Sequence, residues 1–195
     1  MRPTSGALPG CEWGMRVRLH GKLPKYNEES YAHFVTTRTY QSRPYFGDGG
    51  CCRLLVEQLE FYSKRYGFAL VGYVIMPDHL HLIVWWDVED KPHLSISRVM
   101  NSIKTMTAER IKRYLSYNGG ATYLGRVTDV GHPTRRPFSL WQRGFYDFNI
   151  YSEAKLLEKL DYMHNNPVTA GLVSSLGSYE WSTWKLYSSE KVETK

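Results

Sequence analysis

Cysteine is scarce in this 195-residue chain, and long apolar runs are missing. The cysteines, Cys11, Cys51 and Cys52, are odd in number and two of them are adjacent, which argues against a disulfide framework or a thiolate zinc site. No apolar run approaches the ~18 residues that a membrane-crossing helix needs, and residues 1–14 lack a signal-peptide core. We therefore expect one soluble domain in the cytoplasm, with no membrane partner.

Basic and aromatic residues are abundant. The chain has 25 Lys and Arg against 19 Asp and Glu, a net charge of +6, and 14% aromatic residues that include 15 tyrosines. Cationic side chains contact phosphates and aromatic rings stack on bases, so this composition is compatible with a nucleic-acid partner. Many basic proteins never bind nucleic acid, however, and composition alone leaves the partner open.

Extended patterns occur in four parts of the chain. β-Branched and aromatic residues predict strands at 33–40, 68–76 and 79–86, and residues 139–150 also look extended. The second and third strands are separated only by Pro77-Asp78, which predicts a hairpin.

Helical spacing fills the intervals between these strands. It predicts a helix of about fifteen residues that stops at Gly67, a basic amphipathic helix from residue 96, and a last helix over 152–165. Pro167 is expected to end the last helix. The order β-α-β-β-α-β-α predicts an α+β fold: a ferredoxin-like antiparallel sheet with packed helices, plus a C-terminal helix that carries a tyrosine.

The domain boundaries follow from composition. Residues 1–29 are expected to form a loose N-terminal arm, residues 30–185 the folded domain, and residues 186–195 a short tail. Within the domain, glycine, proline and arginine without any period predict a long basic loop over 116–137.

A histidine pair stands out in the hairpin. His79 and His81 lie two residues apart in a predicted strand, so their side chains point to one face, the face that the core is expected to leave free. Residues of the opposite parity supply the core: Leu80, Leu82 and Val84. Two imidazoles on one strand can converge on a metal ion, or can be ordinary polar residues on a half-exposed strand. Asp78 could be a further ligand, but after Pro77 it is more simply a turn residue.

The last predicted helix presents a tyrosine opposite its own core. The core stripe consists of Leu156, Leu157, Leu160, Met163 and His164. Tyr162 points away from this stripe and Asn166 follows one turn later, with Lys155 and Glu158 nearby. A phenol is a weak nucleophile at neutral pH, so it needs a Lewis acid to polarise the group that it attacks. Tyr162 is either such a nucleophile beside the histidine pair or an exposed side chain on a polar helix face.

Three segments together resemble a known family: Tyr73–Val84, Trp141–Asp147 and Asp161–Val173. They closely resemble the single-tyrosine HUH transposases of the IS200-like superfamily, and more narrowly the branch called REP-associated tyrosine transposases. The resemblance covers residues 30–185 and implies the HUH nuclease fold. It also implies an enzyme that cuts single-stranded DNA beside a hairpin and rejoins strands through a covalent 5′-phosphotyrosine intermediate.

The resemblance assigns roles to individual residues. His79 and His81 are the implied metal ligands and catalytic residues, Tyr162 is the implied nucleophile, and Asn166 is the implied third protein ligand. The implied cofactor is a divalent metal ion, Mg²⁺ or Mn²⁺. Hard ions such as Mg²⁺ prefer oxygen ligands, whereas two imidazoles also suit Mn²⁺. Lys155 or Glu158 could influence where the phenol proton goes.

Single-stranded or hairpin DNA is the implied partner, and the protein would be a monomer or homodimer in the cytoplasm, associated with the nucleoid. The expected phosphate contacts are Lys104, Lys112, Arg113, Arg126, Arg135, Arg136 and Arg143, although each alone could be a solvated surface residue. Trp141, Phe145 and Tyr146 could stack bases, with core packing expected for at least two of them. Two alternatives remain: a hairpin DNA- or RNA-binding protein without chemistry, and a metal-dependent hydrolase that uses water.

Overall fold

The computed structural model describes residues 31–117 and 138–188. The expected arm over 1–29, nearly all of the expected basic loop and most of the tail lie outside these residues. Three of the expected phosphate contacts also lie outside them: Arg126, Arg135 and Arg136.

A four-stranded antiparallel sheet forms the centre of the fold, with strand order β2-β3-β1-β4. The strands are β1 (Ala32–Arg38), β2 (Ala69–Met76), β3 (His79–Trp85) and β4 (Tyr146–Ile150). β3 lies between β1 and β2 and pairs with both. β1 and β2, which are connected through the first helix, are therefore not neighbours in the sheet. This is the ferredoxin-like arrangement that the order of elements predicted, and the fold-class prediction is confirmed.

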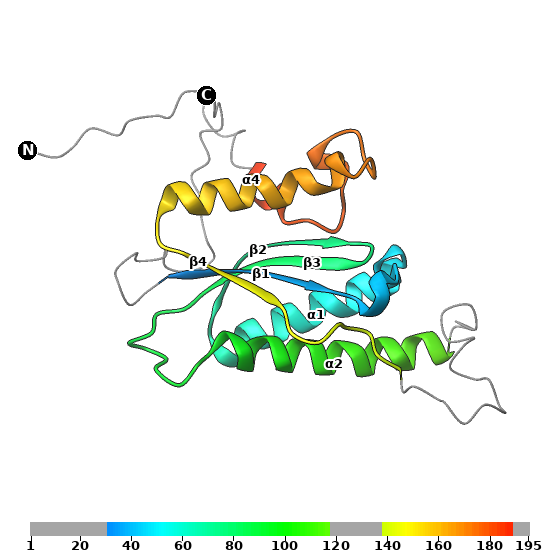
Figure 1. Cartoon of the computed structure of the whole chain (residues 1–195), viewed down its shortest axis with the longest axis horizontal. Coiled ribbons are helices and arrows are strands. Elements are labelled where there is room, and N and C mark those ends of the chain that lie inside the picture. Colours follow the sequence, from blue (N-terminus) through cyan, green and yellow to red (C-terminus); the bar gives the residue numbers. More distant parts are fainter. Residues whose placement is uncertain (1–30, 118–137, 189–195) are drawn as a thin grey trace, which may run out of the picture.

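Helices cover both faces of the sheet (Figure 1). α1 (Gly49–Tyr66) and α2 (Ile96–Tyr117) pack side by side on one face, and α4 (Glu153–Thr169) crosses the other. Short helical turns complete the described part: η1 (Tyr40–Ser42), η2 (Tyr45–Gly47), η3 (Leu176–Ser178) and α5 (Trp184–Ser188). None of the helices in the described ranges is both long and apolar enough to cross a membrane.

Local sequence explains where the helices begin and end. The Asp48 carboxylate accepts hydrogen bonds from the first amides of α1, and Gly67 ends that helix in the left-handed region with φ of 68°. Ser152 caps α4 by accepting from the amide of Lys155. Each cap satisfies backbone groups that a helix end leaves without a partner.

Two apolar cores lie on the two sides of the sheet. Leu80, Leu82 and Val84 of β3 belong to the larger core with α1 and α2, as strand parity predicted. Phe34 and Ile83 face the other way and pack with the apolar stripe of α4. The buried members of that stripe are Leu156, Leu160, Met163 and His164; Leu157, predicted to be in the core, is only half-buried.

Some predicted element boundaries are wrong. Residues 139–150 are not one extended segment, because Trp141 turns into the larger core and Gly144 adopts a φ of 72° before β4 begins. Pro167 lies inside α4 and does not end it. A proline in the last turn removes a single intrahelical hydrogen bond, and its buried ring packs in return. α2 also runs to Tyr117, two residues into the segment predicted as loop.

The chain after α4 returns to the outer edge of β2 and fastens to it. Ile75 donates its amide to the carbonyl of Trp181, and Thr183 donates to the carbonyl of Tyr73. The Tyr179 hydroxyl adds a hydrogen bond to the Ile75 carbonyl. We call residues 179–183 the strap; it satisfies β2 backbone groups that an edge strand would otherwise leave free.

Gly72 of β2 lies directly beneath α4. A Cβ atom built at this position would be 2.6 Å from Cε of Met163, 3.1 Å from Cδ2 of Leu160 and 3.2 Å from Oγ1 of Thr183. The absence of a side chain at this position therefore permits the close approach of helix and sheet.

Candidate functional site

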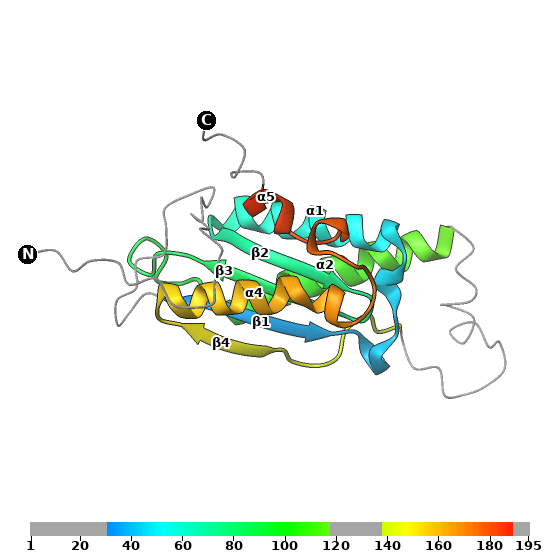
Figure 2. The same cartoon turned by 90° about the horizontal axis from the view of Figure 1, so that it is seen from above.

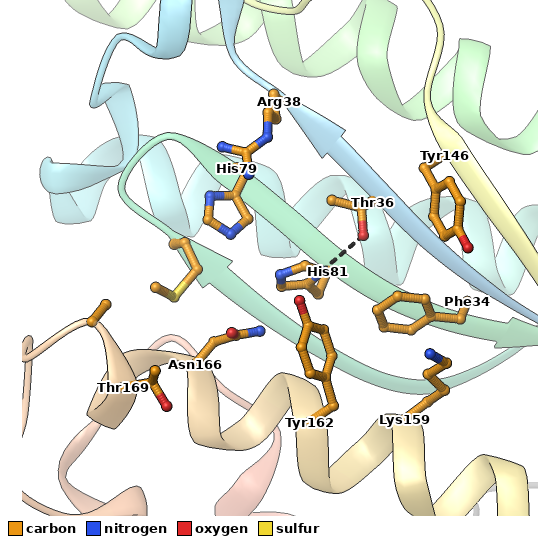
Figure 3. Close-up of a pocket in the computed structure, with 12 residues that line it drawn as sticks. Phe34, Thr36, Arg38, His79, His81, Tyr146, Lys159, Tyr162, Asn166 and Thr169 are labelled. Carbon is orange, nitrogen blue, oxygen red and sulfur yellow. Dashed lines mark hydrogen bonds between the residues drawn. The ribbon is translucent and has the colours of Figure 1, made fainter.

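A cavity of about 530 Å³ lies between the sheet and α4. Its walls come from strands β1 and β3, the last residue of β2, the first residue of β4 and the side of α4 that carries Tyr162 (Figure 3). His79, His81, Tyr162 and Asn166, four residues brought together by sequence reasoning, all line this cavity. The other lining residues are Phe34, Thr36, Arg38, Met76, Tyr146, Lys159, Thr169 and Ala170.

His81 is buried in the cavity wall, with only 4% of the residue exposed. The expectation that both imidazoles lie on a free surface is wrong, because α4 covers this face of the sheet. Thr36 of β1 is the register partner of His81, and its Oγ1 lies 2.9 Å from Nδ1 of the His81 ring. Burial, with smaller effects from His79 and Arg38, lowers the pKa of His81 to about 3, so the ring is neutral at pH 7. Nε2 is buried and has no hydrogen-bond partner.

His79 is fixed by a carboxylate. Its Nδ1 lies 2.6 Å from Oδ1 of Asp78, and the second oxygen of that carboxylate accepts from Nη1 of Arg38 at 3.2 Å. The His79 and His81 ring centroids lie 4.8 Å apart at nearly a right angle. In both histidines Nδ1 lies within hydrogen-bonding distance of an oxygen atom, so Nε2 is the ring nitrogen that can bind a further partner.

Tyr162 and Asn166 approach the histidines from α4. The ring centroids of Tyr162 and His81 are 5.7 Å apart, and Figure 3 shows the Tyr162 hydroxyl directed toward the imidazole. Tyr162 remains 51% exposed, so it is accessible from solvent. The Nδ2 atom of Asn166 is buried without a hydrogen-bond partner.

Two cations in the cavity wall escaped sequence analysis. Lys159 places Nζ 5.8 Å from the Tyr162 ring centroid and 5.4 Å from that of Phe34. Arg38 lies opposite His79 in the register of β1 and β3. Lys159 precedes Tyr162 by three residues, a spacing that could have revealed it. Lys155 and Glu158, considered for the phenol proton, pair with each other at 2.5 Å, and Glu158 also lies 3.8 Å from Nζ of Lys159.

Comparison with known proteins identifies the family of the chain. The sequence profile described as "Transposase IS200 like" matches residues 27–128, just over half of the 195 residues. The chain belongs to the IS200-like transposase family. The matched segment includes His79 and His81, whereas Tyr162 and Asn166 lie beyond it.

Two individual proteins illustrate what the chain is similar to. A Haemophilus influenzae protein described as a REP-associated tyrosine transposase is 25% identical over 121 residues, which cover 62% of this chain and 61% of that relative. The chain therefore matches only about three fifths of the relative's length. A solved structure of a REP-associated tyrosine transposase bound to a REP hairpin superposes with a TM-score of 0.62 at 16% identity, covering 89% of this chain and 88% of that one. The likeness to that structure concerns the fold.

Four of the basic residues expected to contact DNA lie in the described part of the chain, and none of these four lines the cavity. Lys104, Lys112 and Arg113 lie on α2, which packs on the opposite face of the sheet from α4. Lys112, Arg113 and Arg143 are exposed.

Lys104 differs from the other basic residues because its ammonium group is already engaged. Its Nζ donates to the carbonyls of Gln142 and Gly144, at 2.9 and 2.6 Å. Burial also lowers the pKa of Lys104. These contacts join α2 to the segment that leads into β4, so we assign Lys104 to positioning that segment.

The described part of the chain contains no cluster of three or more His, Cys, Asp or Glu residues that could hold a metal ion. Cys51 and Cys52 are buried in the larger core, and burial raises the pKa of each thiol to about 12, so neither is a ready thiolate. A metal ion in the cavity would therefore need Asn166 beside the two histidines.

Proposed function

We propose that this chain is a metal-dependent single-stranded DNA endonuclease and strand transferase of the REP-associated branch, acting at hairpin-forming DNA through a covalent 5′-phosphotyrosine. The observation that carries the proposal is the placement of Tyr162 beside His81. Their ring centroids are 5.7 Å apart in one cavity, and the buried Nε2 of His81 has no partner there. A buried polar atom left unpaired costs about 1–3 kcal/mol, so it points to a ligand.

The residues in the cavity fit a divalent ion. His79 and His81 each engage Nδ1 with a neighbouring oxygen and can offer Nε2, the usual arrangement of ligating histidines. Asn166 would provide the third ligand: a half-turn of its amide would exchange the unpartnered Nδ2 for Oδ1, and amide oxygens bind hard divalent ions. This mixed set suits Mn²⁺ as well as Mg²⁺. When bound, the ion polarises the scissile phosphate and stabilises the charge that develops on its oxygens.

The chemistry assigned to the chain's own residues begins with Tyr162. Its Oη attacks phosphorus and loses its proton, the bond from phosphorus to the 3′-oxygen breaks, and a free 3′-hydroxyl leaves. The 5′-phosphate stays on Tyr162. Because the new bond is also a phosphodiester, attack by another 3′-hydroxyl reverses the step and joins a strand without ATP. Lys159 and Arg38 contribute positive charge around the anionic phosphate.

The proposed partner is a DNA strand with a hairpin next to the cut. A relative of the same fold is known bound to a REP hairpin, and the chain's net charge of +6 favours a polyanion. Exposed Lys112, Arg113 and Arg143 are proposed phosphate contacts away from the cavity. Arg126, Arg135 and Arg136 remain proposals from sequence.

A denaturing gel tests the function. The protein is incubated with Mn²⁺ and a single-stranded oligonucleotide that carries a hairpin, labelled at either the 5′ or the 3′ end. A 5′-phosphotyrosine predicts that the 3′ label migrates with the protein, while the 5′ label appears in a shorter strand with an extendable 3′-hydroxyl. Tyr162→Phe is expected to abolish the adduct. Tyr151→Phe, a matched change at another exposed tyrosine, is expected to retain it.

Other outcomes would support the alternatives. Cleavage that persists in Tyr162→Phe would contradict the proposal and support hydrolysis by water. Tight binding without cleavage by the wild type, with Mn²⁺ or Mg²⁺ present, would indicate a hairpin-binding protein without chemistry.

A further inference from the structure

Tyr146 begins the edge strand β4 at the mouth of the cavity. It is 57% exposed and lines the cavity together with Tyr162 (Figure 3). In the sheet, Tyr146 pairs with Thr36, and Thr36 pairs with His81 on its other side. The three side chains therefore form one row on one face, and about 10 Å separates the backbones of Tyr146 and His81.

The aromatic residues near Tyr146 behave differently. Trp141 is buried in the larger core and Phe145 packs against it, so the expectation that at least two of the three serve the core is confirmed. Phe148 packs in the smaller core on the α4 side. Figure 2 shows α4 above the middle of the sheet and β4 to one side of this helix.

The surroundings of Tyr146 have the chemistry of a nucleotide site. Nζ of Lys159 lies 4.8 Å from the ring centroid of Phe148, two residues along the same face of β4. Arg38 lines the cavity from the neighbouring strand. An exposed aromatic face beside cations matches the combination by which proteins hold single strands: the ring stacks on a base and the cations attract the phosphates.

We propose that Tyr146 stacks against an unpaired base next to the phosphate held at His79 and His81. This inference rests on the proposed function and adds the place of the neighbouring base. Stacking on a phenol ring tolerates any base, so Tyr146 would hold the strand in place and leave recognition of its sequence to other contacts. The hydroxyl of Tyr146 is not required for this role.

Binding measurements with a fluorescent base test the inference. Oligonucleotides carry a hairpin and a single 2-aminopurine, moved through each unpaired position on both sides of the stem. All proteins carry Tyr162→Phe to prevent cleavage. Stacking on Tyr146 is expected to quench one position, and adding Tyr146→Ala is expected to remove that quenching and weaken affinity about tenfold. Tyr146→Phe is expected to retain both.

Tyr151→Ala is the matched control. Tyr151 is 56% exposed and directly follows β4, but it does not line the cavity and its ring contacts Tyr31. Its replacement is expected to change affinity less than twofold (about 0.4 kcal/mol). The inference is overturned if Tyr146→Ala binds as tightly as Tyr151→Ala and keeps the same quenching pattern.

The outcomes separate the two proposals. A wild type that forms no covalent adduct, with binding that still depends on Tyr146, would contradict the proposed chemistry and leave the stacking role intact. If the wild type forms the adduct and Tyr146→Ala leaves DNA affinity unchanged, only the stacking role would be contradicted. A wild type that binds no single-stranded DNA would overturn both.

Discussion

The imidazole of His79 lies 2.6 Å from the carboxylate of Asp78, its neighbour in the chain. The same carboxylate accepts a hydrogen bond from Arg38 on the adjacent strand. Sequence analysis treated Asp78 as a turn residue. In the structure it also orients the ring whose free nitrogen faces the cavity.

Asp78→Asn is expected to weaken Mn²⁺ binding by about 10- to 100-fold, because a neutral amide holds the His79 ring less firmly and makes it a poorer ligand. Titration of Mn²⁺ followed by electron paramagnetic resonance measures the affinity without DNA. Asp147→Asn is the matched control, since Asp147 lies 3.0 Å from His33 on the opposite face of the sheet. Equal Mn²⁺ affinity in the two variants would argue against the role of Asp78.

Lys104→Met is expected to lower the free energy of unfolding by about 1–3 kcal/mol, because two charge-assisted hydrogen bonds to the segment before β4 are lost. It is expected to leave the salt dependence of DNA affinity unchanged. Arg143→Met, at an exposed cation nearby, is expected to reduce the salt slope by about 1. Urea unfolding and binding at several salt concentrations measure both effects. A similar reduction of the slope by Lys104→Met would show that Lys104 contacts phosphate after all.

The buried His164 is expected to make the folded protein less stable in acid. Burial lowers the pKa of His164 to about 4, from an ordinary value of 6.5. Between these pH values the unfolded chain binds the proton and the folded chain does not, so stability is complete above pH 6.5 and falls toward pH 4. The expected loss is about 3 kcal/mol. Urea unfolding at pH 7 and pH 4.5, with metal chelated, should show a smaller loss in His164→Gln than in the wild type; an equal loss would contradict the prediction.

Gly72→Ala is expected to destabilise the protein by about 1–3 kcal/mol and to slow adduct formation, because a new methyl group forces α4 away from the sheet. The end of the Met163 side chain can move, but Leu160 and Thr183 close the other sides. Gly47→Ala is the control, since no atom lies within 4 Å of a Cβ at that position. Thermal unfolding and the rate of adduct formation give the two readouts. Equal effects of both changes would contradict this account of Gly72.

Local patterns were enough to predict the fold and to select four of the cavity residues. Strand parity separated His79 and His81 from the leucines of the larger core, and helix periodicity put Tyr162 and Asn166 on one side of their helix. Both are properties of a single element, so they can be read from the chain. The expectation of a free histidine surface failed because it depends on where α4 packs.

The contacts that sequence reasoning missed join distant elements. In the sequence, Lys104 does not differ from the other cations of its helix. Only the structure shows that its Nζ donates to the carbonyls of Gln142 and Gly144. Arg38 gains its position only from the register of β1 and β3. Pro167 misled for another reason: the rule against proline in helices carries less weight in a last turn that is held by packing.

The strap has a consequence for strand exchange. On the proposed mechanism, the cut DNA end is joined to Tyr162, on a helix that follows directly from β4 at one end and is tied through the strap to β2 at the other. Such a helix cannot carry its DNA to a distant acceptor without breaking these ties. For a helix that keeps these ties, we expect the incoming 3′ end to reach the cavity, which then has to admit a second strand while the first is still attached.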